Sequence, residues 1–378
     1  MANIKIDTTE QEKIVSSLSD KKDAESLRMK RFLEMPDLSR TPGNPINELA
    51  KKIVELPEFK DFDIIETPEI VRADVSFDLF NFPPDHPARS KSDTYYIDEH
   101  ILRTHTTIMW YYYLQNSKIK NQISKLEPVG SLSYGKVYRK DEIDRHHMNV
   151  FHQMDGWYLM PRKHKVIGIE DLQNVLIKIA QAIFGKNIKY RFNKDTFPYT
   201  DPSIEMEIEV NNKWVEVLGS GVVRGSVLKN LGVDPEIYNG WAFGFGLERL
   251  AIISMELPDI RLLWSEDPRI KKQLKLGAAF KEVSKYPPIT RDISFIVEKS
   301  FVPNNYFDLI RDLGGDLVEE VQLIDKYEDD KKFGPDKISY TYRVVYRSMD
   351  RTLTAEGVDK INDEVYKQTK EQFGAELR

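Results

Sequence analysis

The chain has 378 residues, 40% of them hydrophobic, and a formal net charge of −6. This length is enough for one sizeable core and a second, smaller domain, because domains typically span about 100 to 200 residues. The absence of cysteine excludes disulfides, thiolate zinc sites and cysteine nucleophiles. The acidic balance gives no global attraction to nucleic acid, so a nucleic-acid partner would need a local patch.

Residues 1–45 are charged and weakly periodic, and we expect an N-terminal arm with one helix at 21–35, "KKDAESLRMKRFLEM". The first twenty residues mix acidic and basic side chains without an apolar run, which is the pattern of neither a signal peptide nor a basic transit helix. We therefore expect a cytoplasmic protein, with the mature form of an organellar protein as the alternative. We expect no membrane partner, since no apolar stretch is long enough to span a bilayer.

The next segment begins with helical spacing at 46–59 and continues with β-branched and aromatic runs at 62–71 and 93–98. Further along, the apolar stripe at 171–184 ends at Gly185, a usual C-terminal cap, and predicts a helix that packs on a core. The segment therefore combines helices with strands.

A hairpin is predicted in the same domain. Glutamate alternates with apolar residues at 203–210, an Asn-Asn pair follows at 211–212, and a second strand-like run returns at 213–221. This pattern predicts an antiparallel hairpin with one carboxylate-rich face.

A break follows at about Lys281, where a basic segment gives way to Pro287-Pro288. Beyond it the pattern is strand, helix, strand, strand, helix, which predicts a split βαβ sandwich with one open face if one more strand is contributed nearby. Small RNA-binding modules present stacking groups on such a sheet. However, residues 285–378 carry 15 basic and 19 acidic side chains, so the charge pattern does not support RNA binding.

The stretch "GWAFGFGLERLAII" runs from a strand through Gly244 and Gly246 into a helix. A dinucleotide-binding loop would need a third glycine where Arg249 stands, which excludes that fold. A close backbone approach followed by a guanidinium in the first helical turn suits an anionic partner. The alternative is that the glycines only relieve packing and that Arg249 pairs with Glu248 or with solvent.

Two further segments concentrate polar residues in strand-like surroundings. Arg139 lies in an apolar run and must be paired there or point towards a cleft or a bound anion. Alternation places Gln153 and Asp155 on the same face of a later strand. In "LRTHTTIMW", three polar residues are expected to share one face: Arg103, His105 and Thr107.

These segments resemble, in order and spacing, the phenylalanyl-tRNA synthetases, and the single-chain organellar type more than the heterotetrameric type. The blocks are "ETPEI", "DHPARSKSDTYYI", "LRTHT", "VYRKDEID", "FHQMDG", "FPYTDPSIEMEI", "WVEVLGSG", "WAFGFGLERLA" and "LPDIR". "SKYPPITRDISF" and "LGGDLVEEVQLIDKY" resemble the family's ferredoxin-fold anticodon-binding domain. The resemblance implies an α+β protein: an arm at 1–45, a class II catalytic domain with an antiparallel sheet at 46–280, and a ferredoxin-like split βαβ domain at 281–378.

The family's functional residues match positions of this sequence one by one. Arg139 matches the arginine that holds the ATP α-phosphate, and Arg249 matches the one that receives the terminal phosphate; the resemblance implies that both are catalytic. It also implies ATP contacts from Asp141, His147 and Glu216, with Glu216 as a candidate Mg²⁺ ligand. For the amino acid it implies His105, Thr107, Gln153, Asp155, Phe197, Tyr199, Gly221 and Ala242.

Three departures from the family pattern fall at the amino-acid pocket. Asp155 replaces the common Glu, Tyr199 replaces a Phe, and Thr106-Thr107-Ile108-Met109-Trp110 replaces a T-S-x-x-Q continuation. The resemblance implies ATP- and Mg²⁺-dependent activation of phenylalanine and its transfer to tRNA(Phe). We expect a monomer, with a homodimer as the alternative. The departures leave open an adenylating enzyme for another amino acid or acceptor. A non-catalytic RNA-binding paralogue is the third alternative; two unpaired arginines in one cleft would argue against it.

Overall fold

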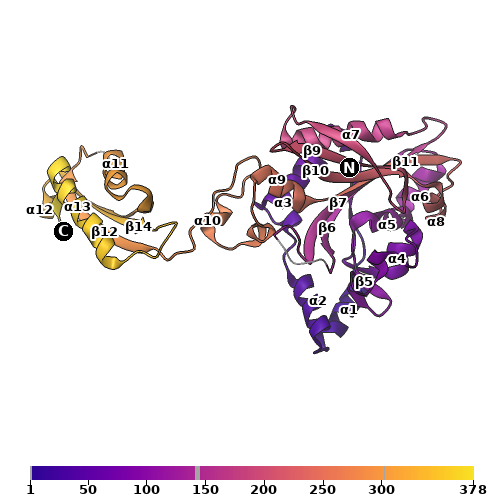
Figure 1. Ribbon diagram of the computed structural model, residues 1–378, viewed down its shortest axis with the longest axis horizontal. Coiled ribbons are helices and arrows are strands. Elements are labelled where there is room, and N and C mark those ends of the chain that lie inside the picture. The colour runs from indigo at the N-terminus through magenta and orange to yellow at the C-terminus, as the bar shows by residue number, and fades with distance from the viewer. Residues whose placement is uncertain (1, 141–144, 302) are drawn as a thin grey trace. The chain divides into compact units, whose positions relative to one another are not determined.

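The computed structural model describes residues 2–140, 145–301 and 303–378. The chain divides into two compact units, Met1–Phe280 and Lys281–Arg378, and each has its own sheet and its own core (Figure 1). Asp141, which we expected at the ATP site, lies outside the described residues.

An eight-stranded sheet forms the centre of the first unit, in the order β1-β2-β6-β7-β11-β10-β9-β8. The pairs β1·β2 and β2·β6 are parallel, and the other pairs of this sheet are antiparallel. A smaller sheet has the order β3-β5-β4. The strands of this unit are β1 (Asn3–Lys5), β2 (Asp63–Glu66), β3 (Ile70–Arg72), β4 (Tyr96–Ile97), β5 (His100–Leu102), β6 (Val129–Tyr138), β7 (Val150–Pro161), β8 (Tyr190–Asp195), β9 (Thr200–Val210), β10 (Lys213–Val223) and β11 (Tyr238–Gly246).

Helices α3, α7 and α9 pack together, and α7 and α9 lie against the large sheet. The predicted helix ending at Gly185 is confirmed as α7, which buries Leu172, Leu176 and Ile179. The helices of this unit are α1 (Thr9–Ser19), α2 (Ala24–Glu34), α3 (Pro45–Val54), α4 (Ala73–Phe77), α5 (Met109–Gln115), α6 (Ser117–Ser124), α7 (Ile169–Phe184), α8 (Gly225–Asn230), α9 (Leu247–Met255) and α10 (Pro268–Lys271), with 3₁₀ turns η1 (Leu38–Arg40), η2 (Pro57–Phe59), η3 (Asp78–Phe80), η4 (Pro87–Arg89), η5 (Thr106–Ile108) and η6 (Ile260–Trp264).

The predicted hairpin is confirmed as β9 and β10. Both turn residues, Asn211 and Asn212, have positive φ (50° and 60°), as a two-residue hairpin turn with matching twist requires. The glutamates of β9 do not form a bare acidic face, because basic and amide side chains on and next to β8 bind them. These pairs are Lys189–Glu209, Arg191–Glu207 and Asn193–Glu205.

The N-terminal segment is more ordered than we expected. It contributes β1 to the sheet and two helices, α1 and α2, where the sequence indicated one. The periodicity of α1 is weak because Leu18 is its only buried residue. The Gln11 side chain ties this helix to the smaller sheet by accepting the backbone N–H groups of Glu69 and Ile70, at 2.6 and 3.1 Å.

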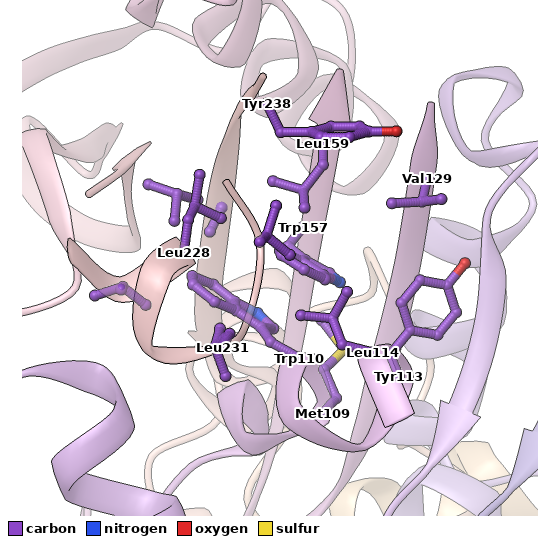
Figure 2. Packing of buried hydrophobic residues seen from close by; sticks show 14 of the residues in the cluster. Met109, Trp110, Tyr113, Leu114, Val129, Trp157, Leu159, Leu228, Leu231 and Tyr238 are labelled. Carbon is purple, nitrogen blue, oxygen red and sulfur yellow. The ribbon is translucent and has the colours of Figure 1, made fainter. Parts of the chain in front are cut away.

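An aromatic core lies between β7 and helices α5 and α8. The rings of Trp110 and Trp157 stack with centroids 5.0 Å apart and planes 9° apart (Figure 2). The Trp157 indole N–H donates to Ser131 Oγ at 2.7 Å. Because Trp157 belongs to the same strand and the same face as Asp155, this core is the rigid base on which the polar part of that face rests.

The second unit contains a four-stranded sheet in the order β13-β14-β12-β15, and its fourth strand comes from the end of the chain. Helices α11 and α13 pack against one another, and the apolar core includes Tyr342 of β14 and Val365 of α13. The α+β prediction is confirmed. The elements are β12 (Ile289–Glu298), α11 (Pro303–Gly314), η7 (Gly315–Leu317), β13 (Val318–Tyr327), α12 (Asp330–Phe333), β14 (Lys337–Tyr346), α13 (Ala355–Phe373) and β15 (Glu376–Leu377).

Candidate active site

Two adjoining cavities, of about 390 and 370 Å³, lie over β7, β10 and β11 of the large sheet. They share four lining residues: Arg139, Gln153, Phe197 and Tyr199. The first cavity also brings in His147, Glu216 and Arg249, and the second brings in His105. The structure therefore brings together eight of the residues that the sequence singled out.

Arg249 lies in the first turn of α9, directly after β11 ends at Gly246. Its Nη1 donates to the backbone oxygen of Glu216 at 3.2 Å and lies 3.6 Å from the Glu216 carboxylate. Both side chains are about half exposed, at 49% and 50%. The expectation of two unpaired arginines was thus wrong for Arg249. Its pairing with Glu248 was wrong as well, because Glu248, at the wall of the first cavity and 3% exposed, binds His152 instead.

Arg139 follows β6 and lies where the two cavities meet. Its Nε donates to the Thr104 backbone oxygen at 3.1 Å, and its guanidinium lies 5.1 Å from the centre of the Phe151 ring. Nη2 is 3.5 Å from Gln153 Oε1. The guanidinium is thus held by a carbonyl and an aromatic face while it lines both cavities.

Gln153 and Asp155 lie on the same face of β7, which confirms the alternation predicted from the sequence. Gln153 Nε2 donates to Asp155 Oδ2 at 2.9 Å. Thr106 and Thr107 also donate their hydroxyls to this carboxylate. A Cβ on Gly244 would lie 2.7 Å from Asp155 Oδ1, so the glycine leaves room for the carboxylate beneath the cavity. At Gly246, by contrast, a Cβ would meet nothing within 4 Å.

Burial shifts the pKa values of two groups near the second cavity. Burial raises the pKa of Asp155 to about 6, although its three hydrogen-bond donors and Arg139 act in the opposite direction. Burial, together with the charge of Arg139, lowers the pKa of His105 to about 3, so its ring is neutral at physiological pH. The Nδ1 atom of His105 is buried without a hydrogen-bond partner. A buried polar atom of this kind is suited to a ligand that supplies the missing bond.

An aromatic wall closes the second cavity. Phe197 and Tyr199, from the segment between β8 and β9, stack with centroids 5.9 Å apart. The Tyr199 ring meets Trp110 edge to face at 6.1 Å, and the Phe82 ring stacks on His105 at 5.8 Å. Burial raises the pKa of Tyr199, and the nearby Asp155 charge adds to the shift. The second cavity therefore combines an aromatic wall with polar residues such as His105 and Gln153.

Four of the predicted amino-acid residues do not line either cavity: Thr107, Asp155, Gly221 and Ala242. Ala242 is part of the aromatic core. A Cβ on Gly221 would approach Thr200 Cβ to 2.6 Å and Pro202 O to 2.7 Å, so this glycine allows the start of β9 to pack closely. Thr107 and Asp155 lie behind Gln153 and act on the cavity through it.

Arg103 does not share a face with His105 and Thr107, which corrects the strand alternation we expected there. Strand β5 ends at Leu102, and Thr107 lies in a 3₁₀ turn. The Arg103 guanidinium is buried and donates to the backbone oxygens of Thr67 and Lys136, at 2.8 and 2.7 Å. Its role is to join segments of backbone rather than to bind a ligand.

A buried ion network beneath the site was missed in the sequence. His152 Nδ1 lies 2.6 Å from Glu248, and Nε2 lies 3.3 Å from Asp37. The available signal was the alternation of β7, which puts His152 on the face opposite Gln153, towards α9. The partner carboxylates could not be found this way, because Asp37 is more than a hundred residues away in the sequence.

Among the described residues, Glu216 and Glu248 are the carboxylates that line the first cavity, and Glu248 is bound to His152. No group of three or more His, Cys, Asp or Glu in the described part of the chain is arranged to hold a metal ion by itself. Glu216, however, presents a half-exposed carboxylate to the cavity beside Arg249. Since Mg²⁺ bound to phosphates needs only one or two protein carboxylates, this single oxygen donor fits the ion. Among all the residues that the structure describes, no helix is long and apolar enough to cross a membrane.

Comparison with known families assigns both units. Residues 32–274 match the family described as tRNA synthetases class II core domain (F). Residues 284–378 match the ferredoxin-fold anticodon binding domain. The two matches cover most of the chain and lie on either side of the boundary between the compact units.

The similar proteins are phenylalanine–tRNA ligases or subunits of such enzymes. The chain is 38% identical over 359 residues to the chloroplastic/mitochondrial phenylalanine–tRNA ligase of Arabidopsis thaliana, covering 90% of this chain and 80% of that protein. It is 35% identical to the mitochondrial enzyme of Mus musculus, covering 85% and 76%. It is also 35% identical to a phenylalanine–tRNA ligase alpha subunit of Caldicellulosiruptor bescii, covering 66% and 79%. With both domains on one polypeptide, the chain belongs to the single-chain phenylalanine–tRNA ligases, a family of class II aminoacyl-tRNA synthetases.

Proposed function

We propose that this enzyme activates phenylalanine with ATP in the paired cavities and transfers it to tRNA(Phe). The observation that carries the assignment is the placement of Arg139 and Arg249 on one cavity that opens, past Gln153, into an aromatic-walled one. An anion-binding end joined to an end with an aromatic wall suits a nucleoside triphosphate beside an aromatic amino acid.

Arg139 and Arg249 hold the phosphates at opposite ends of the chain of phosphoryl groups. When the amino-acid carboxylate attacks the α-phosphate, negative charge builds up on the phosphate oxygens. Arg139, fixed by Thr104 and Phe151, donates to that charge. Arg249 binds the terminal phosphate, which helps keep the leaving pyrophosphate in line with the attacking oxygen. His147 lines the same cavity on the nucleotide side.

Glu216 is the described residue that would hold Mg²⁺. When bound, the ion would neutralise phosphate charge. Glu216 lies 3.6 Å from Arg249, so phosphate binding would exchange one partner of the arginine for another. Asp141 is proposed as a further ATP contact on the resemblance alone.

The amino acid is bound in the second cavity, beside the aromatic wall. Gln153 faces the cavity with its carbonyl oxygen, because its Nε2 is committed to Asp155. That oxygen can accept a hydrogen bond from the substrate ammonium, and the neutral His105 ring lines the same cavity with a free hydrogen-bonding capacity at Nδ1. Phe197 and Tyr199 receive the aromatic ring.

The test is amino-acid-dependent exchange of labelled pyrophosphate into ATP, measured for each of the twenty amino acids. Phenylalanine should give the highest rate. If another amino acid gave a higher rate, that amino acid would be the substrate and not phenylalanine. No exchange with any amino acid would favour the non-catalytic paralogue.

We propose that the second unit binds tRNA at a distance from the chemistry, since its ferredoxin-fold match names anticodon binding. A fragment ending at Phe280, where the first compact unit ends, should still form the adenylate but charge tRNA poorly. If the fragment and the whole chain charged tRNA equally well, the proposed tRNA-binding role of the second unit would be wrong.

For compartment and assembly, we propose an organelle and a monomer. The names of the Arabidopsis and mouse relatives place those enzymes in chloroplasts or mitochondria, which supports the organellar alternative over the cytoplasm. Cell fractionation tests the compartment. Sedimentation tests the monomer against a homodimer.

A further inference from the structure

The point where β11 leaves the large sheet needs a substitute for backbone pairing. The last paired residues of β11 and β7 are Gly246 and Gln153. The next residue of the chain starts helix α9, so the backbone N–H of His152 loses its expected neighbour in β11. The Glu248 carboxylate takes that position, with oxygens 2.9 and 2.8 Å from the His152 nitrogen. A side chain thus continues the ladder after the strand has ended.

The same carboxylate also binds the imidazole ring. His152 Nδ1 lies 2.6 Å from Glu248, and the side chains are 0% and 3% exposed. On the other side of the ring, Nε2 lies 3.3 Å from Asp37 and 2.9 Å from the backbone nitrogen of Leu38. The Trp264 ring covers it at 5.5 Å. Removing one member of such a buried, hydrogen-bonded ion pair leaves the charge of the other member buried without a partner, which is strongly destabilising. Breaking the contact between Glu248 and His152 should therefore be costly.

We propose that Glu248 and His152 are positioning residues for adenylation: they fix the first turn of α9 against β7 and so hold Arg249 at the phosphate end of the cavity. The inference rests on the proposed phosphate role of Arg249.

The contacts of Arg249 itself show why its backbone must be fixed from elsewhere. Its hydrogen bond and its ion pair are both with Glu216, and its side chain is about half exposed. An exposed ion pair of this kind contributes little rigidity. Glu248 is the adjacent residue. It is 3% exposed where it borders the first cavity, and both of its carboxylate oxygens accept from the His152 backbone N–H, so its contact with β7 sets the direction in which α9 starts.

The segment 151–153 of β7 links this contact to the rest of the site. Phe151 lies under the Arg139 guanidinium at 5.1 Å, His152 binds Glu248, and Gln153 binds Asp155. Three consecutive residues therefore join the two arginines and the amino-acid end to one strand. A shift of α9 relative to β7 would change the distance between the two phosphate-binding groups.

The charge state of the network supports a tight contact at neutral pH. The N–H of Leu38, which donates to Nε2, favours a neutral ring. Burial also lowers the pKa of His152, but Glu248 and Asp37 outweigh burial and raise this pKa to about 9. Burial would raise the pKa of Asp37, but the His152 ring, Ser39 and Arg40 lower it to about 2.

The experiment replaces Glu248 with Gln in the full chain and measures KM for ATP and for phenylalanine in pyrophosphate exchange. Glu248→Gln keeps the shape and removes the charge and one of the two carboxylate oxygens. We expect KM for ATP to rise, or kcat to fall, by about 10- to 100-fold, since small misplacements of a positioned group have effects of this size. KM for phenylalanine should change less than twofold.

Asp63→Asn is the matched control. Asp63 is also buried and accepts a hydrogen bond from Tyr113 at 3.2 Å, but it lies in β2, and neither cavity includes it. The Asp63→Asn variant should have a lower thermal stability, and its KM for ATP should change no more than its KM for phenylalanine. Asp37→Asn, which keeps the Glu248–His152 contact, provides a milder variant and should shift the ATP parameters in the same direction by a smaller factor.

The outcomes separate this inference from the proposed site. If Arg249→Ala abolishes exchange while folded Glu248→Gln and Asp37→Asn keep the parent ATP parameters, the positioning role is wrong and the phosphate site stands. If Glu248→Gln does not fold, Asp37→Asn decides: an unchanged KM and kcat for ATP in that variant overturns the proposal. Equal losses for ATP and phenylalanine in Glu248→Gln, matching those of Asp63→Asn, would also overturn it.

Discussion

The two ends of the site are built differently. At the phosphate end, Arg249 and Glu216 are half exposed and touch mainly one another. At the amino-acid end, Asp155 is buried, bound by three donors, and backed by the stacked Trp110 and Trp157. The first end is therefore held by few contacts and the second by many.

The difference follows from what each end must recognise. Phosphates carry charge that flexible, solvated guanidinium groups can follow as it develops. An aromatic side chain offers shape and little else, so discrimination needs a rigid wall. Mutations should therefore act through lost charge at one end and through disturbed packing at the other.

The largest effect should come from removing charge at the phosphate end. Arg249→Ala and Arg139→Ala should each reduce pyrophosphate exchange by at least about 100-fold, because loss of one donor to a developing anion costs about 3 kcal/mol or more. Arg191→Ala is the matched control: that arginine also forms an ion pair, with Glu207, but lies in β8 away from the cavities. Exchange near the parent rate in either cavity variant would mean that the ATP site is misplaced.

The rigid end should respond to one added methyl group. In Gly244→Ala the new Cβ would lie 2.7 Å from Asp155 Oδ1, so the carboxylate must move. We expect a loss of about 1–3 kcal/mol in the free energy of unfolding, as for overpacked cores, and a higher KM for phenylalanine. Gly168→Ala, where a Cβ would meet nothing within 4 Å, has no such clash and should cost less, since only the exchange of the N-cap residue of α7 remains. Denaturant unfolding and exchange kinetics measure both; a neutral Gly244→Ala would show that this end is adaptable too.

The amino-acid end should also depend on pH. With a pKa of about 6, Asp155 becomes protonated at lower pH and no longer holds the Gln153 amide as a charged acceptor. KM for phenylalanine should then rise by up to about tenfold per pH unit below 6, the limit for a single titrating group. The pKa of Asp155 in the folded protein lies above the usual 3.8, so lowering the pH from 6 towards 3.8 protonates this group with a gain in folding stability, and its titration does not unfold the protein. A KM that is flat from pH 7 to 5 would contradict the role.

The smallest effect concerns the Tyr199 hydroxyl. Phenylalanine and tyrosine differ by one hydroxyl, which an apolar pocket rejects by only about 100-fold. We expect detectable tyrosine activation by the parent chain. Tyr199→Phe makes the wall more apolar and should raise the preference for phenylalanine by about 2- to 10-fold, the value of one net hydrogen bond. The measurement is kcat/KM for phenylalanine divided by kcat/KM for tyrosine. A lower value in the variant than in the parent would contradict the inference that the Tyr199 hydroxyl makes the wall more polar.

Local pattern was sufficient to predict the elements whose signal is carried by neighbouring residues. The helix ending at Gly185, the hairpin at Asn211-Asn212 and the shared face of Gln153 and Asp155 all depend on spacing of a few residues. The ligand-facing side chains could be found because the resemblance covers contiguous blocks. Partners distant in sequence could not be found in this way: Glu216 for Arg249, and Asp37 and Glu248 for His152. Helix α1 was missed because it buries too little to show a period.

Strand β1 has a consequence for the solubility of the protein. It pairs with β2 from Asn3 to Lys5 and thereby covers an edge that carries Ile64 and Ile65. The opposite edge strand, β8, has its own protection in charged residues such as Arg191 and Lys194. Trimming the first five residues would uncover the β2 edge, and an uncovered apolar edge recruits other strands. Such a shortened chain should keep both cavities and yet self-associate during expression.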